Sequence, residues 1–170
     1  MTHQPEDPKA MLACYADGPA QLLAALAGLN EIGLDLGPAD GGWTIRQIVH
    51  HIADGDALWG ACVEMALGTA TGFSLQWYWA RSQDEWAKVW HYAERAVEPS
   101  LVLFSANRAH IVQLLEQVPD AWSRRMALQM PDGSERSITV EEVIAMQAGH
   151  ARGHIADIRA IRELHQGSHG

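Results

Sequence analysis

Hydrophobic side chains recur every three or four residues along most of the chain, and clusters of Gly and Pro separate the periodic segments. This spacing predicts helices rather than strands. The four main helices cover about residues 8–29 (interrupted at Asp17-Gly18-Pro19), 44–67, 98–118 and 140–165, and a short helix covers about 82–92. The pattern is typical of an all-α up-down four-helix bundle, and 170 residues suit a single domain over residues 1–170.

Helix starts are marked by a repeated local signal. Thr44, Ser82 and Thr139 each stand three residues before a Gln or Glu, which forms a capping box in which the two side chains satisfy free backbone amides. The connections between helices are long for a minimal bundle. The Trp-rich residues 73–79 are expected to form an irregular loop, and residues 126–138 a small hairpin or loop. Loops of this length are often functional.

The composition narrows the class of protein. Hydrophobic residues make up 48% and charged residues 19%, as in an ordinary globular domain. The formal net charge of −9 argues against nucleic acid as a partner, because affinity for phosphate backbones depends on clustered cations.

We expect a cytoplasmic protein without a membrane partner, because the polar start does not resemble a secretory signal and no apolar run approaches the ~20 residues of a membrane span. Cys14 and Cys62 are expected to be free thiols, although the sequence leaves a disulfide between them open.

The nine histidines of the chain are candidates for metal binding or catalysis. On a helical wheel of about 100° per residue, Gln147, His150 and His154 fall within about 50° of the centre of the last helix's apolar stripe. Asp157 lies near the edge of the stripe, and Arg152 lies outside it and is expected to be solvated. Burying a polar group costs about 1–3 kcal/mol unless it finds a partner, so Gln147, His150 and His154 need partners if the face is buried. The stripe consists of Val140, Val143, Ile144, Met146, Ile155, Ile158, Ile161 and Leu164.

The spacing of His150 and His154 suits a metal ion. Two imidazoles four residues apart lie on one face of a helix, so their ring nitrogens can converge on one cation. The alternative interpretation is a pair of core histidines that are hydrogen-bonded to their neighbours.

A third ligand is available on the helix over residues 44–67. By the same wheel, His51 lies about 90° from the centre of the apolar stripe, on its border, whereas His50 lies about 170° away and is expected to face solvent. His51 is therefore the candidate ligand. Asp54 is expected to be a solvated acid, or else to orient an imidazole. Asp56 falls near the centre of the stripe, where it either lines the site with a partner or is exposed by a bend in the helix.

Other notable side chains have a plainer interpretation. His91 and His110 are expected to be surface or core-edge residues rather than ligands. The indoles of the Trp-rich region either roof an apolar pocket or pack the loop onto the bundle, and packing is favoured because aromatic side chains mostly serve burial. These indoles are Trp77, Trp79, Trp86 and Trp90.

Two segments together resemble a known family. Residues 41–54 read GGWTIRQIVHHIAD, and residues 150–156 read HARGHIA. In this order they are similar to the DinB/YfiT-like superfamily, and the similarity covers nearly the whole chain. The resemblance implies a four-helix bundle with a metal ion held by His51, His150 and His154, often in a homodimer. A family member carries histidine at positions where this chain has Asp56, Arg152, Gly153 and Asp157.

A site of three neutral imidazoles keeps a coordination position open, as catalytic metal sites do. Zinc suits such a divalent site best, and nickel, iron or manganese also accept imidazoles. A bound metal can activate water, which gives a hydrolase, or hold a thiol as thiolate, which gives a transferase. Gln147 and Asp157 are the candidates for orienting an imidazole or a bound water.

The resemblance selects among these chemistries. Several family members look like thiol S-transferases, so the leading hypothesis is a metal-dependent enzyme that transfers a small, bacillithiol-type thiol to electrophiles in detoxification. The small-molecule substrate itself stays undefined. Metal-dependent hydrolysis is the first alternative, and non-catalytic binding of a metal or small ligand is the second.

Overall fold

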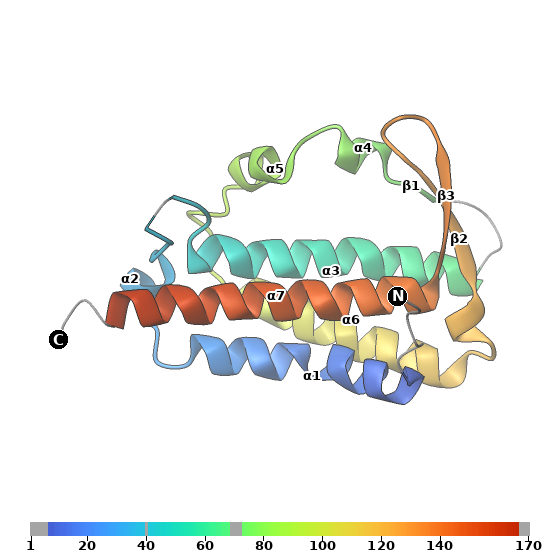
Figure 1. Cartoon of the computed structure of the whole chain (residues 1–170), viewed down its shortest axis with the longest axis horizontal. Coiled ribbons are helices and arrows are strands. Elements are labelled where there is room, and N and C mark those ends of the chain that lie inside the picture. Colours follow the sequence, from blue (N-terminus) through green and yellow to red (C-terminus); the bar gives the residue numbers. More distant parts are fainter. Residues whose placement is uncertain (1–6, 40, 69–72, 167–170) are drawn as a thin grey trace, which may run out of the picture.

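The computed structural model describes residues 7–39, 41–68 and 73–166 of the chain. Long helices lie side by side in a bundle, and short helices and a small sheet are added at its side and end (Figure 1). The elements are α1 (Pro8–Leu26), α2 (Glu31–Leu34), α3 (Ile45–Gly68), β1 (Phe73–Ser74), α4 (Gln76–Trp79), α5 (Gln83–Val89), α6 (Glu98–Gln117), the 3-10 turn η1 (Ala121–Ser123), β2 (Arg125–Gln129), β3 (Glu135–Thr139) and α7 (Val140–Gln166).

The bundle is formed by α1, α3, α6 and α7. Helices α6 and α7 each pack against both α1 and α3, so α1 and α3 occupy opposite corners of the bundle, as do α6 and α7. This arrangement confirms the predicted all-α four-helix bundle with long connections. None of the described helices combines the length and the apolar composition that a membrane span requires.

The order of helix directions differs from the expected up-down alternation. His50, early in α3, bonds to Ser100, early in α6, and the later residue Asp56 pairs with the later residue Arg108. Helices α3 and α6 therefore run parallel, while α1 and α7 run the other way (Figure 1). The reason is the segment that carries α4 and α5, which returns along the outside of α3 before α6 begins. Hydrophobic periodicity reports helix faces and carries no information about helix direction.

A three-stranded sheet lies at one end of the bundle in the order β1-β2-β3. Strands β2 and β3 form the predicted hairpin, whose turn places Gly133 at a φ of 82°, a conformation that favours glycine. β1 pairs parallel with β2. The Trp-rich stretch, expected as an irregular loop, thus begins with a short strand and continues as the one-turn helix α4. The inward side chains Met126, Leu128 and Ile138 are buried in the core.

The predicted capping boxes are present. Thr44 Oγ1 accepts from the backbone N–H of Gln47 at 3.3 Å, and Gln47 Oε1 accepts from the backbone N–H of Thr44 at 2.9 Å. The boxes that begin at Ser82 and Thr139 make the same reciprocal pairs. The predicted starts of α3, α5 and α7 are therefore confirmed.

Helix α1 continues through Asp17-Gly18-Pro19, where the sequence suggested an interruption. Proline has no backbone N–H, so the carbonyl oxygen of Tyr15, four residues earlier, lacks its usual helical partner. The Nη1 of Arg108 on α6 donates to this oxygen at 2.7 Å. Gly18 leaves the space for this contact, because a Cβ there would clash with the same guanidinium. A side chain from another helix thus accommodates the proline inside α1.

The apolar core forms two clusters along the bundle, and a polar layer lies between them. We define the polar layer as Asp56 on α3, Arg108 on α6 and His150 on α7, each of which stands between members of the two clusters along its own helix. The first cluster includes Tyr15, Cys62, Ile111, Ile144 and Ala148, and the second includes Leu22, Ala53, Phe104, Ala151 and Ile155.

Candidate metal centre

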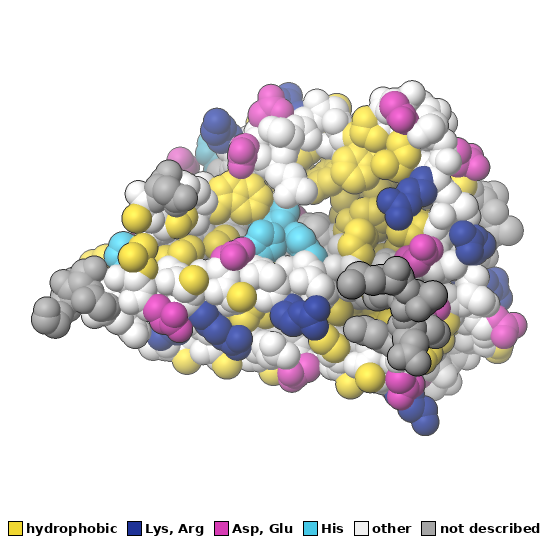
Figure 2. Space-filling view, in the orientation of Figure 1, with side chains coloured by type: hydrophobic (Ala, Val, Ile, Leu, Met, Phe, Trp, Pro, Cys, Tyr) yellow, Lys and Arg dark blue, Asp and Glu magenta, His cyan; other side chains and the backbone are white. Residues whose placement is uncertain are grey.

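Three imidazoles converge at the level of the polar layer. His51 comes from α3, and His150 and His154 come from successive turns of α7. One nitrogen of each ring lies within 4.8 Å of the others, and the Nε2 atoms of His51 and His150 are 2.8 Å apart. His51 is buried, whereas the other two rings are half-buried. We call these three side chains the ring cluster. Figure 2 shows histidine side chains in a hollow near the middle of this face, with hydrophobic side chains on both sides.

The surroundings keep two of these rings, His51 and His150, uncharged. Burial, together with the smaller effect of the charges that His150 and His154 would carry, lowers the pKa of His51 to about 3. Burial also lowers the pKa of His150 to about 4, with smaller contributions from His154 and from the Arg108 guanidinium. At neutral pH both rings therefore offer a lone pair, which is the form of histidine that binds metals.

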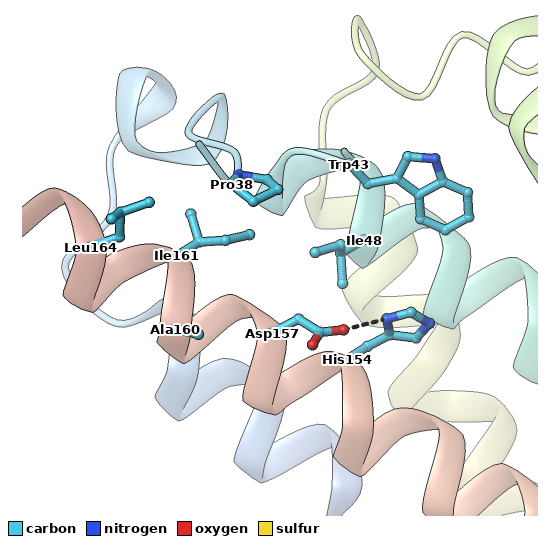
Figure 3. A pocket seen from close by; sticks show the side chains of 8 residues that line it. All are labelled: Pro38, Trp43, Ile48, His154, Asp157, Ala160, Ile161 and Leu164. Carbon is cyan, nitrogen blue, oxygen red and sulfur yellow. Dashed lines mark hydrogen bonds and ion pairs between the residues drawn. The ribbon is translucent and has the colours of Figure 1, made fainter. Parts of the chain in front are cut away.

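Two neighbours orient the rings. Asp157 Oδ2 lies 3.1 Å from Nδ1 of His154, and an Nδ1–H that donates to this carboxylate leaves the Nε2 lone pair of the same ring free (Figure 3). The Trp43 indole packs edge-on against His51 at a centroid distance of 4.5 Å and stacks on His154 at 6.3 Å. Asp157 was a candidate for this role. Trp43 was missed, although it stands immediately before the capping box of α3.

The ring cluster suits a divalent metal ion. Its donors are imidazole nitrogens from helices far apart in sequence, and the described residues place no carboxylate among them. Two such nitrogens at 2.8 Å bring two lone pairs together unless one ring donates a proton or a cation lies between the rings. Imidazole donors fit zinc, nickel or iron better than magnesium or calcium, which prefer oxygen.

Asp56 does not reach the ring cluster. Its carboxylate is 1% exposed and pairs with Arg108, whose Nε donates to Oδ1 at 2.9 Å. Burial raises the pKa of Asp56 to about 6, and the guanidinium opposes this shift. Arg108 also lies between the rings of Tyr15 and Phe104, at 4.2 and 4.4 Å from their centroids. The predicted need for a partner is met, and α3 does not bend to expose the acid.

Arg108 was not predicted from the sequence to be buried. The signal was its spacing, because Phe104, Arg108, Ile111 and Leu115 recur at helical intervals and all four are buried. A charged residue in such a stripe indicates a buried ion pair, and Asp56 is the matching acid on the neighbouring helix.

His50 is buried, which corrects the expectation that it faces solvent. Its ring is 0% exposed. Nε2 lies 3.2 Å from the backbone oxygen of Arg95 and must donate there, so Nδ1 accepts from the hydroxyl of Ser100 at 2.7 Å. The wheel placed His50 opposite the main apolar stripe of α3, but the start of α6 and the turn before it cover that side.

The remaining candidates lie away from the ring cluster. Asp54 pairs with Arg95, at 3.6 Å between Oδ2 and Nη1, so it neither is simply solvated nor orients a ring of the cluster. His91 and His110 are exposed, as predicted, and lie near Glu94 and Glu64. Arg152 is exposed as well.

A large apolar cavity adjoins the ring cluster. Its volume is about 540 Å³. In Figure 3, Pro38 and Trp43 lie across from side chains of α7, and His154 and Asp157 stand at one end of the row along α7. His165, further along α7, bonds through Nε2 to the backbone oxygen of Gly37 and ties the loop that carries Pro38 to this helix.

A smaller cavity of about 210 Å³ adjoins the other two rings. It is lined by His51 and His150 together with side chains from α4 and α7, among them Trp79 and Gln147. Of the indoles in the Trp-rich region, only Trp79 lines this cavity. The others contact one another, with Trp86 at 5.9 Å from Trp77 and 4.6 Å from Trp90 between ring centroids, as expected for packing.

Comparison with known proteins assigns the class. The profile of the DinB superfamily matches residues 15–158, and this chain belongs to that superfamily. The resemblance of residues 41–54 and 150–156 to this family is therefore confirmed.

Particular relatives refine the picture. A protein of Geobacillus thermodenitrificans, named "Putative metal-dependent hydrolase", is 31% identical over 160 residues, which cover 93% of this chain and 85% of the relative. A relative of the same descriptive name from Geobacillus kaustophilus is 31% identical over 146 residues, covering 85% and 78%. Among solved structures, YfiT from Bacillus subtilis, described as a probable metal-dependent hydrolase with an unusual four-helix bundle topology, superposes with a TM-score of 0.81 at 22% identity, covering 98% and 93%. That likeness establishes the shared fold.

Proposed function

We propose that the protein is a metal-dependent enzyme whose ring cluster activates a small thiol for transfer to an electrophile. The observation that carries this proposal is the position of the ring cluster between two unlike cavities. His154 lines a large apolar cavity, and His51 and His150 line a smaller one with polar groups in its wall. A transferase must hold two organic reactants, whereas a hydrolase needs room for one reactant and water.

His51, His150 and His154 would hold the ion, for which zinc is the best match. A divalent ion bound there lowers the pKa of a coordinated thiol or water, which makes either a better nucleophile at neutral pH. The chain's own residues prepare the site. Burial keeps His51 and His150 neutral, Asp157 accepts the Nδ1 proton of His154, and the Trp43 indole limits rotation of two rings.

The apolar cavity would receive the electrophile. Its wall of Ile48, Ile161 and Leu164 excludes water from an apolar reactant beside His154. In the transfer, the thiol loses its proton to solvent, a sulfur lone pair forms the bond to the electrophilic carbon, and the leaving group departs with the electrons of the broken bond. The products are the thioether, the leaving group and the released proton.

Hydrolysis is the second candidate, and the names of the relatives favour it. The same ring cluster would then activate water toward an ester or amide that lies in the apolar cavity. The two reactions differ in one requirement, because hydrolysis proceeds without added thiol.

The test uses purified protein that is stripped of metal and reloaded with zinc, or in parallel with nickel, iron or manganese. It is mixed with monochlorobimane and bacillithiol, glutathione or mycothiol. We expect conjugation that requires the metal, that His51→Ala abolishes and that the exposed-site control His110→Ala preserves. Cleavage of esters or amides without thiol would instead support hydrolysis.

The third hypothesis, a protein that binds metal without catalysis, predicts different results in these assays. Metal would bind at the ring cluster, but neither conjugation nor cleavage would be found with any of the four metals. If the ion were structural, its removal by a chelator would melt the bundle. We expect the helical circular dichroism signal to persist instead, because the two apolar clusters are complete without the rings.

A further inference from the structure

The smaller cavity beside the ring cluster contains polar atoms without partners. Among the described residues, Gln147 Oε1 and Trp79 Nε1 are buried and make no hydrogen bond, and both side chains line this cavity. The Gln147 side chain is deeply placed, with 4% of the residue exposed. Buried donors and acceptors are nearly always paired in native proteins, so a cavity wall with one unpaired acceptor and one unpaired donor points to a bound group that satisfies both.

The residues that carry these atoms are held in place. The backbone oxygen of Gln147 accepts from Nη2 of Arg108 at 3.0 Å, which ties this turn of α7 to the polar layer. The Trp79 ring packs against Tyr78 at a centroid distance of 5.2 Å and belongs to the edge of the first apolar cluster. The backbone of Gln147 and the indole of Trp79 are therefore held in place.

The chemistry of the wall limits what can bind. The side chains that line the cavity include no Lys, Arg, Asp or Glu. Apart from the ion that the ring cluster would hold, an anion would find no cation there and a cation no carboxylate, so the group that lies against Gln147 and Trp79 is neutral. It needs an N–H or O–H for Gln147 Oε1 and an acceptor oxygen for Trp79 Nε1. A secondary amide offers both within one group, a donor N–H and an acceptor oxygen on the neighbouring carbonyl carbon.

We propose that this cavity, which we call the amide subsite, binds a secondary amide of the thiol substrate beside the ring cluster. The amide N–H donates to Gln147 Oε1, and the amide oxygen accepts from the indole N–H of Trp79. Assigning the amide to a thiol rests on the proposed function, whereas binding of an amide at this place does not.

The first experiment measures binding without any reaction. Zinc-loaded, ¹⁵N-labelled protein is titrated with N-methylacetamide, and the indole N–H resonance of Trp79 is identified by its absence in Trp79→Phe. We expect this resonance to shift in a saturable way, and to shift far less with methyl acetate, which lacks the N–H. Gln147→Leu should weaken the amide's affinity by about 2- to 12-fold, the value of one neutral hydrogen bond. Trp77→Phe, at an exposed ring outside both cavities, is the matched control.

The second experiment asks whether the amide belongs to the thiol. N-acetylcysteamine and 2-mercaptoethyl acetate differ only in an N–H replaced by oxygen. In metal-dependent conjugation we expect a lower KM for the amide thiol than for the ester thiol, and loss of this preference in Gln147→Leu. Circular dichroism checks folding, and Gln147→Met replaces the Leu variant if that variant does not fold.

The outcomes separate the two proposals. If the Trp79 resonance does not move, or moves equally with methyl acetate, the cavity holds ordered water only and the amide subsite is wrong. If the amide binds but no thiol is ever transferred, the subsite stands and the proposed function fails. If conjugation proceeds with no preference between the two thiols, the function stands and the assignment of the amide to the thiol is wrong.

Discussion

At the scale of single residues, the adjacent pair His50 and His51 shows how one step along a helix changes what an imidazole can do. Both ring nitrogens of His50 are used, one by the Ser100 hydroxyl and one by the Arg95 carbonyl, so no lone pair is left for a metal. His51 turns its Nε2 toward His150. Position relative to α6 and α7, and not residue type, separates a structural histidine from a candidate ligand.

This difference predicts opposite results for the two variants. His51→Ala and His150→Ala should lose bound metal on dialysis, because each removes one of three donors. His50→Ala should keep the ion and lose about 2–4 kcal/mol of stability, because it leaves a cavity and buried polar groups without partners. Metal content by mass spectrometry and urea unfolding measure the two effects. Loss of the ion from His50→Ala with retention in His51→Ala would contradict the assignment.

Asp157 would act on a bound metal ion through His154, whose Nδ1 it contacts. Asp157→Asn removes the carboxylate that accepts the Nδ1 proton, and we expect metal affinity to fall by about 10-fold, near the lower end of the usual effect because this carboxylate is exposed. Competition with a chromophoric chelator gives the affinity. Glu163→Gln, at an exposed acid on the same helix, should leave the affinity unchanged.

At the scale of elements, α1 shows why a helix can contain proline. The residues Asp17-Gly18-Pro19 predict a helix break, and proline does leave one carbonyl of the helix without its backbone donor. The break does not occur because Arg108, from α6, donates to the carbonyl that Pro19 leaves free. Local signals placed the starts of α3, α5 and α7 correctly, since capping boxes are complete within one turn. They failed where the deciding partner comes from another helix.

Arg108 is therefore expected to be the most sensitive position of the bundle outside the ring cluster. Arg108→Met leaves Asp56 buried without its cation and the Tyr15 carbonyl without its donor, which should cost about 3–5 kcal/mol of unfolding free energy. Urea unfolding checks this value. Arg159→Met, at an exposed arginine of α7, should change stability by less than about 0.5 kcal/mol. Adding Asp56→Leu to Arg108→Met should recover part of the loss, and a double variant as unstable as the single one would contradict the pairing.

At the scale of the whole molecule, the neutral rings make the metal-free protein sensitive to acid. Below pH about 6.5 the imidazoles of the unfolded chain take up protons, whereas His51 and His150, with pKa values of about 3 and 4, stay neutral in the folded protein. The contribution of the two neutral rings to the free energy of unfolding is therefore fully present above pH 6.5. It is lost as the pH falls toward 3, by at most about 1.4 kcal/mol per pH unit for each ring. Asp56, with its raised pKa, opposes this trend between pH about 6 and 4.

The measurement is urea unfolding of chelator-treated protein between pH 4 and pH 7. His150→Gln removes one of the two rings and should make the decline with acid shallower. His110→Gln changes an exposed histidine and should reproduce the parent curve. An equal slope in all three proteins would show that the rings are not held neutral.

The bundle and its candidate site could be predicted to different depths. Helical periodicity located α3, α6 and α7 to within a few residues. The spacing of His150 and His154 predicted that these two rings share one face of α7, and the helical wheel of α3 selected His51 as the third candidate ligand. Helix direction, the cover over His50 and the partner of Asp56 could not be predicted, because each depends on which helices are neighbours in space. The cavities belong to this second group, since segments far apart in the sequence form each of them jointly.

The ring cluster also joins the first third of the chain to its last helix. An ion can be captured there only after α3 and α7 have come together, so it arrives late in folding and opposes the separation of those helices. Loading should accordingly slow unfolding far more than it speeds folding. In a cell, metal supply would then govern how long each molecule survives before proteases can reach it, in addition to whether it is active.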